Sequence, residues 1–169
     1  MINIGVIYTF PSEIETVRSA LSRRGAQILP QSSSDNPTDL IVYSANQKTS
    51  KTVLDDLNNQ GVLIRQVSEV QNVNPSIIMS VDNKSFNLKN GRYKCIFETK
   101  SPVLAITAAN IAMLHDDVHL DNLILSGSSQ DNTVLVFSGS RDEVEAAIKS
   151  TKFITQKSQE KGRTGMDLL

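Results

Sequence analysis

The segment GVIYT at residues 5–9 is matched in outline by CIFET at residues 95–99, and a proline follows each segment, Pro11 or Pro102. Runs of β-branched and aromatic residues are typical of strands. Proline suits the first turn of a helix, where its missing N–H would have no partner in any case. A strand followed by a helix is therefore expected twice, at an offset of roughly ninety residues, and a repeat of this kind decides the fold.

The two copies continue in the same order after the first helix. Each has a strand, a polar turn, another apolar strand, a second helix and a last short strand. These later strands are expected at residues 26–29 and 118–125, 40–44 and 134–138, and 62–64 and 153–155. The order βαββαβ is the split βαβ arrangement of ferredoxin-like folds. The sequence therefore predicts an α+β protein made of two tandem ferredoxin-like βαββαβ domains, each with an antiparallel sheet and helices on one face.

Capping residues mark the ends of the first helix in each copy. Ser12 and Glu15 have the spacing of a capping box, and Gly25 suits the position just after a helix because glycine tolerates a left-handed backbone. In the second copy Ser101 can cap the helix expected at residues 103–114. Alanines are frequent in that helix, which indicates close packing against a sheet or a neighbouring subunit.

The domain organisation follows from the repeat. The first domain is expected at residues 1–67, a connector at 68–92, the second domain at 93–156 and a mobile polar tail at 157–169. Within the connector, the apolar runs at 77–79 and 85–88 can form a small hairpin. The tail has two glycines and no hydrophobic periodicity, as is typical of mobile termini.

Composition excludes several classes of function. Seventeen Lys and Arg balance eighteen Asp and Glu, for a formal charge of −1, which argues against a nucleic-acid binder and against a polybasic membrane-surface protein. The single cysteine, Cys95, allows no intrachain disulfide. No run approaches the roughly 20 apolar residues that span a bilayer, and the N-terminus lacks the features of a signal peptide. A soluble, cytoplasmic protein is expected.

The second copy resembles the bacterial microcompartment (BMC) shell domain, and the resemblance covers about residues 93–154. The segments that carry it are CIFET at 95–99, AANIAM at 108–113, DVHL at 117–120, SGSS at 126–129, VLVFSG at 134–139 and DEVEAAI at 142–148. The resemblance extends to residues 2–67 only through the internal repeat. It implies a structural shell protein of the tandem-domain type.

What this resemblance implies is an assembly with a pore. Single-domain members of the family form flat hexamers that tile into a shell, and tandem members form trimers whose six domains imitate a hexamer. In both, the turn between the second and third strands lines a central pore for small metabolites. Carried onto this sequence, the pore-lining residues are Gln31, Ser32, Ser33, Ser34, Ser126, Gly127, Ser128 and Ser129. Serine hydroxyls both donate and accept hydrogen bonds, which suits small polar solutes, although such turns are also common for backbone reasons alone.

The sequence departs from the family in two places. The family carries a lysine at the hexamer edge, near the end of the first helix, and Ser22 and Leu114 occupy that region here. Tiling into extended sheets is therefore in doubt, whereas a homotrimer and contacts with other shell proteins remain expected. Some tandem relatives hold an iron–sulfur cluster through a cysteine in the pore turn. Neither turn contains a cysteine here, so no cofactor is predicted.

Two other interpretations stay open beside the shell protein. The pair His115 and His119 has the i,i+4 spacing of a zinc site on a helix, but the helix is expected to end near Asp116, so a polar helix end is favoured and no metal is predicted. No nucleophile, base and orienting group stand at a recognisable spacing, and an enzyme is not expected. The alternative function is a regulatory module that binds a small molecule at a domain interface.

Overall fold

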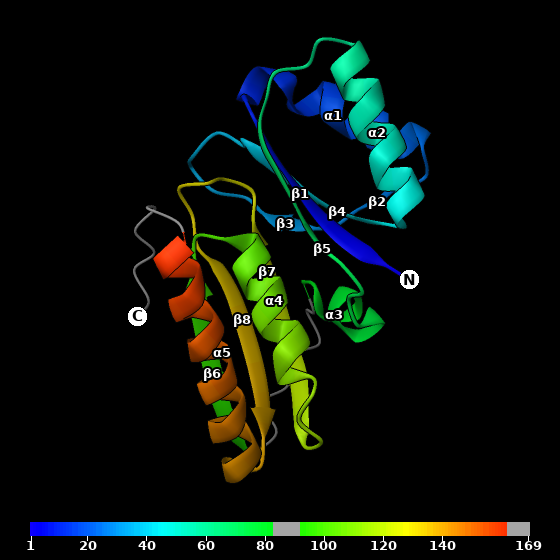
Figure 1. Cartoon of the computed structure of the whole chain (residues 1–169). Coiled ribbons are helices and arrows are strands. Elements are labelled where there is room, and N and C mark those ends of the chain that lie inside the picture. The colour runs from blue at the N-terminus through cyan, green and yellow to red at the C-terminus, as the bar shows by residue number, and fades with distance from the viewer. Residues whose placement is uncertain (83–91, 162–169) are drawn as a thin grey trace.

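The computed structural model describes residues 1–82 and 92–161 (Figure 1). The first copy comprises β1 (Asn3–Thr9), the 3-10 helix η1 (Pro11–Glu13), α1 (Ile14–Arg23), β2 (Gln27–Ile28), β3 (Gln31–Ser32), β4 (Leu40–Ala45), α2 (Gln47–Asn59) and β5 (Ile64–Val70). A short helix, α3 (Pro75–Ser80), follows. The second copy comprises β6 (Tyr93–Thr99), α4 (Pro102–Ala112), β7 (Val118–Ser126), β8 (Thr133–Gly139) and α5 (Arg141–Lys161).

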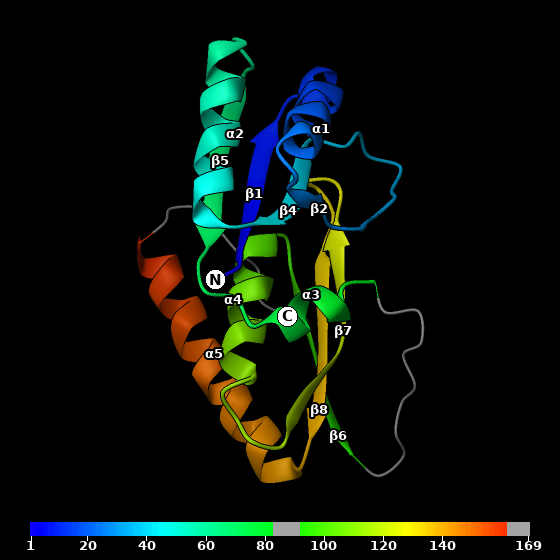
Figure 2. The ribbon, with the colours of Figure 1, turned by 90° about the vertical axis from the view of Figure 1, so that its right-hand side faces the viewer.

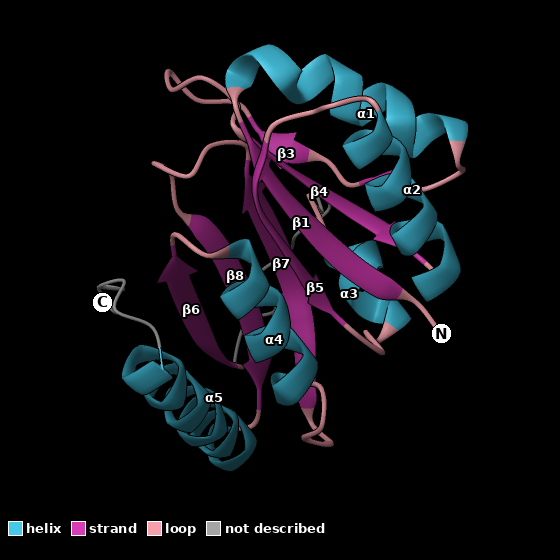
Figure 3. Ribbon diagram, turned by 45° about the horizontal axis from the view of Figure 1, so that its top comes forward, coloured by secondary structure: helices cyan, strands magenta, loops and turns pink. Residues whose placement is uncertain are grey.

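The structure has two four-stranded sheets, one centred on each copy. The first has the order β2-β4-β1-β5, and β1 is antiparallel to both of its neighbours. The second has the order β3-β7-β8-β6, so that β3, a strand of the first copy, completes the sheet of the second by pairing parallel to β7 (Figure 3). The predicted α+β fold with two tandem ferredoxin-like domains is confirmed.

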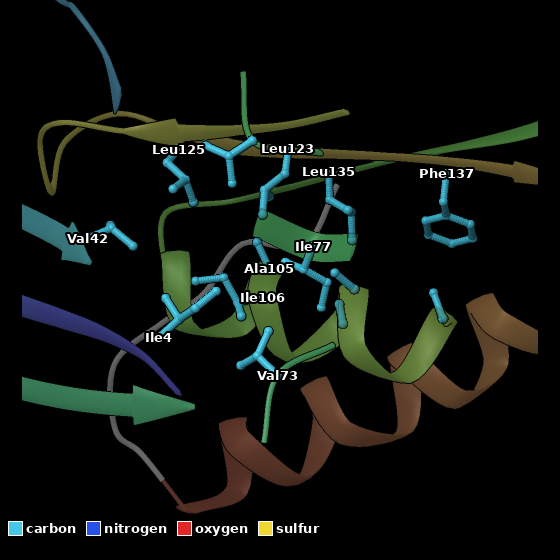
Figure 4. Close-up of a cluster of buried hydrophobic side chains, with 14 of the residues drawn as sticks. Ile4, Val42, Val73, Ile77, Ala105, Ile106, Leu123, Leu125, Leu135 and Phe137 are labelled. Carbon is cyan, nitrogen blue, oxygen red and sulfur yellow. The ribbon is translucent and has the colours of Figure 1, made fainter. Parts of the chain in front are cut away.

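The two copies pack on one another through α4, which lies between the two sheets (Figure 4). One face of the first sheet contributes Ile4 and Val42 to the same core as Ala105 and Ile106 of α4 and Leu123 of β7. Seven of the eleven residues of α4 are buried, as expected of a helix that is apolar all round. Small side chains let this helix approach both sheets, which confirms the close packing that its alanines indicated.

The opposite face of the first sheet is covered by α1 and α2. Ile7, Ile41 and Tyr43 pack there against the apolar faces of the two helices. The Tyr43 ring lies directly over Gly5 of the neighbouring strand, in the space that a β-carbon at residue 5 would occupy. Alternation along the strands therefore divides the apolar residues of the first sheet between two cores.

Three of the four capping predictions are confirmed. Gly25 has φ +73° after α1, and Pro102 is at the start of α4, where the Ser101 hydroxyl accepts a hydrogen bond from the Leu104 N–H at 3.2 Å. The capping box of Ser12 is wrong, because the chain enters α1 through η1 and neither helix start has a side-chain cap.

Several predicted elements differ from the structure. Residues 153–155, expected as a strand, belong to α5, and residues 77–79 belong to α3, whose N-terminus is capped by Asn74. Short apolar runs do not distinguish strand from helix, and Pro75 at the helix start favours α3. The strand expected at 62–64 shares only Ile64 with β5, which begins there and runs to Val70, past residue 67. Residues 157–161 of the expected tail are helical, while 85–88 and 162–169 lie outside the described residues.

Among the described residues, no helix combines the length and the apolar character that crossing a bilayer requires.

Candidate functional site

The two serine-rich turns lie side by side. β3 pairs parallel to the end of β7, with Gln31 opposite Leu125 and Ser32 opposite Ser126. The Gln31 side chain strengthens this junction, since its Nε2 donates to the carbonyl oxygens of Ser126 at 2.8 Å and of Leu40 at 3.2 Å. The eight residues expected to line a pore are thus brought to one place by the pairing of two short backbone segments.

Asp39, in the loop before β4, holds the second turn against the first copy. Its carboxylate accepts hydrogen bonds from the Ser129 backbone N–H at 2.7 Å and from the Ser129 hydroxyl. Its own N–H donates to the carbonyl of Gly127 at 3.3 Å. Arg65 of β5 lies 2.8 Å from the same carboxylate and stacks over the Phe10 ring. Figure 2 shows the loop between β7 and β8 reaching the first copy at this point.

The electrostatics of this junction keep Asp39 ionised. Burial by itself would raise the pKa of Asp39, but hydrogen bonds from Ser129 and the charge of Arg65 outweigh it and hold the pKa below its ordinary value. Burial, together with the nearby Asp39 charge, raises the pKa of Tyr8. The junction is therefore a charged, hydrogen-bonded contact between the copies.

Side chains also join the two turn regions directly. Gln31 donates to the Ser126 carbonyl at 2.8 Å, and the Asn36 amide donates to the Asp131 carboxylate at 3.0 Å. The turns of the two copies are therefore in contact within one chain.

The expected pore residues differ in exposure. Ser33 and Ser34 are exposed, and Gln31, Ser32 and Ser129 are half-buried. Ser126, Gly127 and Ser128 are buried within the chain. The Ser126 hydroxyl bonds the Thr133 hydroxyl at 3.1 Å, and the Ser128 hydroxyl accepts from the Gln130 N–H at 3.1 Å. Ser33 and Ser34 are thus the members of the set that face solvent.

Sequence reasoning missed Asp39 and Arg65, although they hold the turns together. Both belong to the first copy, and the main partner of Asp39 is 90 residues away. The one available signal was the polar pair Thr38 and Asp39 directly before the apolar strand β4. A residue in that position commonly interacts locally, so the pattern did not predict a contact with the other copy.

The two residues expected at a disc edge lie on different helices. Ser22 is exposed near the end of α1, and Leu114 follows α4 with 79% of its surface exposed. Neither of them belongs to the junction of the turns, and both are on the outside of the chain.

The histidine pair is divided between two environments. His115 Nδ1 lies 3.4 Å from the Glu143 carboxylate on α5, whereas His119 Nε2 lies 3.8 Å from the Asp117 carboxylate. Within residues 1–82 and 92–161, no group of three His, Cys, Asp or Glu side chains is placed to hold a metal ion. Cys95 is half-buried, and burial raises the pKa of its thiol, which disfavours the reactive thiolate.

Two solved structures are similar to this architecture. A microcompartment protein from Desulfitobacterium hafniense DCB aligns over 100% of this chain and 94% of its own, with 14% sequence identity and a TM-score of 0.74. The double-ringed trimeric shell protein from the RMM microcompartment aligns over 90% of this chain and 81% of its own, with 18% identity and a TM-score of 0.54. The chain has the fold of microcompartment shell proteins.

The shell-protein fold spans both copies and their junction, so the resemblance found in the second copy is confirmed for the fold of the whole chain. No protein-family model matches the sequence, and no curated protein matches it. The regulatory subunit of aspartate kinase from Thermus thermophilus aligns with a TM-score of 0.33, a value at which the likeness has no bearing on this chain.

Proposed function

We propose that this chain is a structural shell protein of a bacterial microcompartment, which assembles as a homotrimer and surrounds a central polar pore for small metabolites. The six domains of the trimer would imitate a hexamer. The protein would lie in the cytoplasm, in contact with other shell proteins. The protein would act through assembly and selective diffusion, without catalysis, cofactor or metal. One observation carries the proposal: the two serine-rich turns lie side by side in a chain that has the fold of microcompartment shell proteins.

The contacts of the turns support a shared axis. In a closed ring, the turns near the axis would meet the turns of the neighbouring domain. Within one chain the two turn regions touch through Gln31 with Ser126 and through Asn36 with Asp131. Three chains, each with two such domains, would complete a ring of six. Ser33 and Ser34, which are exposed, are the proposed lining of its opening.

The rival function, a regulatory module, requires a ligand pocket where the domains meet. That interface is filled here by side chains of α4, and Ala105, Ile106 and Ala109 have no exposed surface. Around these three residues the interface is closely packed. The packing between the copies therefore favours the shell protein.

Solution mass tests the proposal directly. Light scattering coupled to gel filtration should give a basic unit of about 55 kDa, three times the 18.5 kDa of one chain, and negative-stain class averages should show threefold discs. A basic unit of one or two chains would contradict the pore and would favour the regulatory module.

A further inference from the structure

β6 is an edge strand of the second sheet, whereas its equivalent in the first sheet, β1, is a central strand. In the first copy β1 is paired on both sides, with β4 and with β5. Its equivalent in the second copy, β6, pairs with β8, and no strand among the described residues lies on its other side (Figure 3). The reason is α5, which continues as a helix through the residues where a fourth strand was expected.

Apart from the charged side chains of Lys94 and Glu98, β6 has none of the features within its own strand that normally prevent pairing. Natural edge strands are short, interrupted by bulges or proline, or dense in charge. β6 is seven residues long, holds a continuous register with β8 from Tyr93 to Thr99 and contains no proline. Ile96, at its centre, is 66% exposed, although its cross-strand neighbour Val136 is buried. The apolar pair of Ile96 and Val136 therefore ends at this edge.

The sequence of β6 is complementary to itself. We propose that the β6 strands of two copies pair antiparallel about a twofold axis centred on Ile96, which joins their sheets into one. In this register Ile96 lies opposite its own equivalent, and Lys94 of each strand lies opposite Glu98 of the other. Opposite charges and apolar pairs that face each other across antiparallel strands are both stabilising. The occupant of the open edge is thus a second copy of this chain.

The alternation of the strand supports the same register. Lys94, Ile96 and Glu98 share one face, while Cys95 and Phe97 point toward the helices and pack on the core. A shift by two residues would place Lys94 opposite Ile96 or opposite Lys100, losing the charge pairs or setting like charges together. In the register centred on Ile96, by contrast, Lys94, Ile96 and Glu98 each have a favourable partner. The contact is also isologous, as a twofold contact must be.

The position of β6 gives this contact a role beyond a dimer. β6 is at the opposite edge of the second sheet from β3, which belongs to the serine turns. If three chains close around the turns, three β6 edges remain to pair with other trimers. A threefold unit with twofold contacts extends into a net or closes into a shell, so the pairing would supply the tile-to-tile contact that Ser22 and Leu114 leave in doubt.

Charge reversal tests the pairing. Sedimentation velocity of the full chain should show species of at least twice the basic unit for the wild type. Lys94→Glu and Glu98→Lys should each weaken self-association by about tenfold or more, because each sets two like-charge pairs across the axis. The double variant K94E/E98K has both charges exchanged and should recover the wild-type mass. Circular dichroism should be used to check that each variant folds.

A disulfide provides a second test. In a background with Cys95→Ala, Ile96→Cys should cross-link to its equivalent under mild oxidation, because directly opposed antiparallel residues lie about 4.5–5.5 Å apart, within disulfide reach. Lys94→Cys is the matched control. In the proposed register its equivalent is four residues away along the strand, about 13 Å, so it should remain uncross-linked.

The outcomes separate this pairing from the proposed trimer. In the two charge-reversed variants the β6 edges should not pair, so their mass in sedimentation velocity is that of the basic unit, one chain or three. The trimer is thereby tested independently of the pairing. Equal masses for all four proteins would overturn the pairing. A double variant as weakly associated as the single variants would also overturn it, because the charges would then not face each other.

Discussion

The carboxylate of Asp39, before β4, accepts hydrogen bonds from both the backbone N–H and the hydroxyl of Ser129, in the turn after β7. Asp39→Ala should lower the free energy of unfolding by about 1–3 kcal/mol, because it leaves partly buried donors without their charged acceptor. Asp35→Ala, at an exposed position in the same loop, is the control and should stay within about 0.5 kcal/mol of the wild type. Urea unfolding measures both. Equal effects would mean that Asp39 does not hold the copies together.

The same carboxylate predicts a pH dependence. The pKa of Asp39 is lowered in the folded protein, so its contribution to stability is complete above the pKa of an unfolded aspartate, about 3.9. That contribution is lost as the pH falls through the lower, folded value. The loss of stability between about pH 5 and about pH 2 should therefore be smaller for Asp39→Asn than for the wild type. Identical slopes in urea unfolding across that range would contradict the assignment.

The contact between Tyr43 and Gly5 predicts a coupled pair. A methyl group at residue 5 would meet the Tyr43 ring, and Gly5→Ala should cost about 1–3 kcal/mol, as overpacking does. Tyr43→Leu removes the ring and should make the added Gly5→Ala substitution much less costly. A double-mutant cycle by thermal or urea unfolding gives the interaction energy. Additive effects would show that the glycine is not there to admit the ring.

Local signals predicted those parts of the fold that local chemistry decides. Ser101, Pro102 and Gly25 mark helix ends through bonds within a few residues, so a pattern is enough to find them. The long α5 could not be predicted in the same way, since residues 153–155 suit a strand equally well. Because residues 153–155 are helical, β6 is left at the edge of its sheet, which the sequence alone did not predict.

The candidate site was predicted only as a set of residues. The family resemblance named both turns, but it did not say that β3 would join the second sheet or that Ser126 and Ser128 would be buried. Those facts depend on contacts between segments some 90 residues apart, such as Asp39 with Ser129. Long-range polar contacts leave no periodic pattern in a sequence, because each partner also suits an ordinary turn.

The position of α4 between two sheets predicts a strict limit on side-chain size. Ala109 has no exposed surface and belongs to the core that both copies share. Ala109→Leu should lower the free energy of unfolding by about 1–3 kcal/mol or more, because the added methylenes force the sheets apart. Asn58→Leu, on the exposed side of α2, is the control. Unfolding curves that superimpose for the two variants would contradict the buried position of α4.

The proposed ring predicts a particular yield of cross-linking at Ser33. In a Cys95→Ala background, Ser33→Cys places one thiol per chain near the axis, and a short bis-maleimide should link neighbouring chains. One thiol makes one link, so a closed trimer can join only two of its three chains, and the covalent dimer should plateau at about two thirds of the protein. A twofold dimer would instead approach complete conversion. Asn58→Cys, exposed on α2 and away from the turns, should give little product. A denaturing gel scored against time distinguishes these cases, and a yield well above two thirds would place Ser33 at a twofold contact and not at a pore.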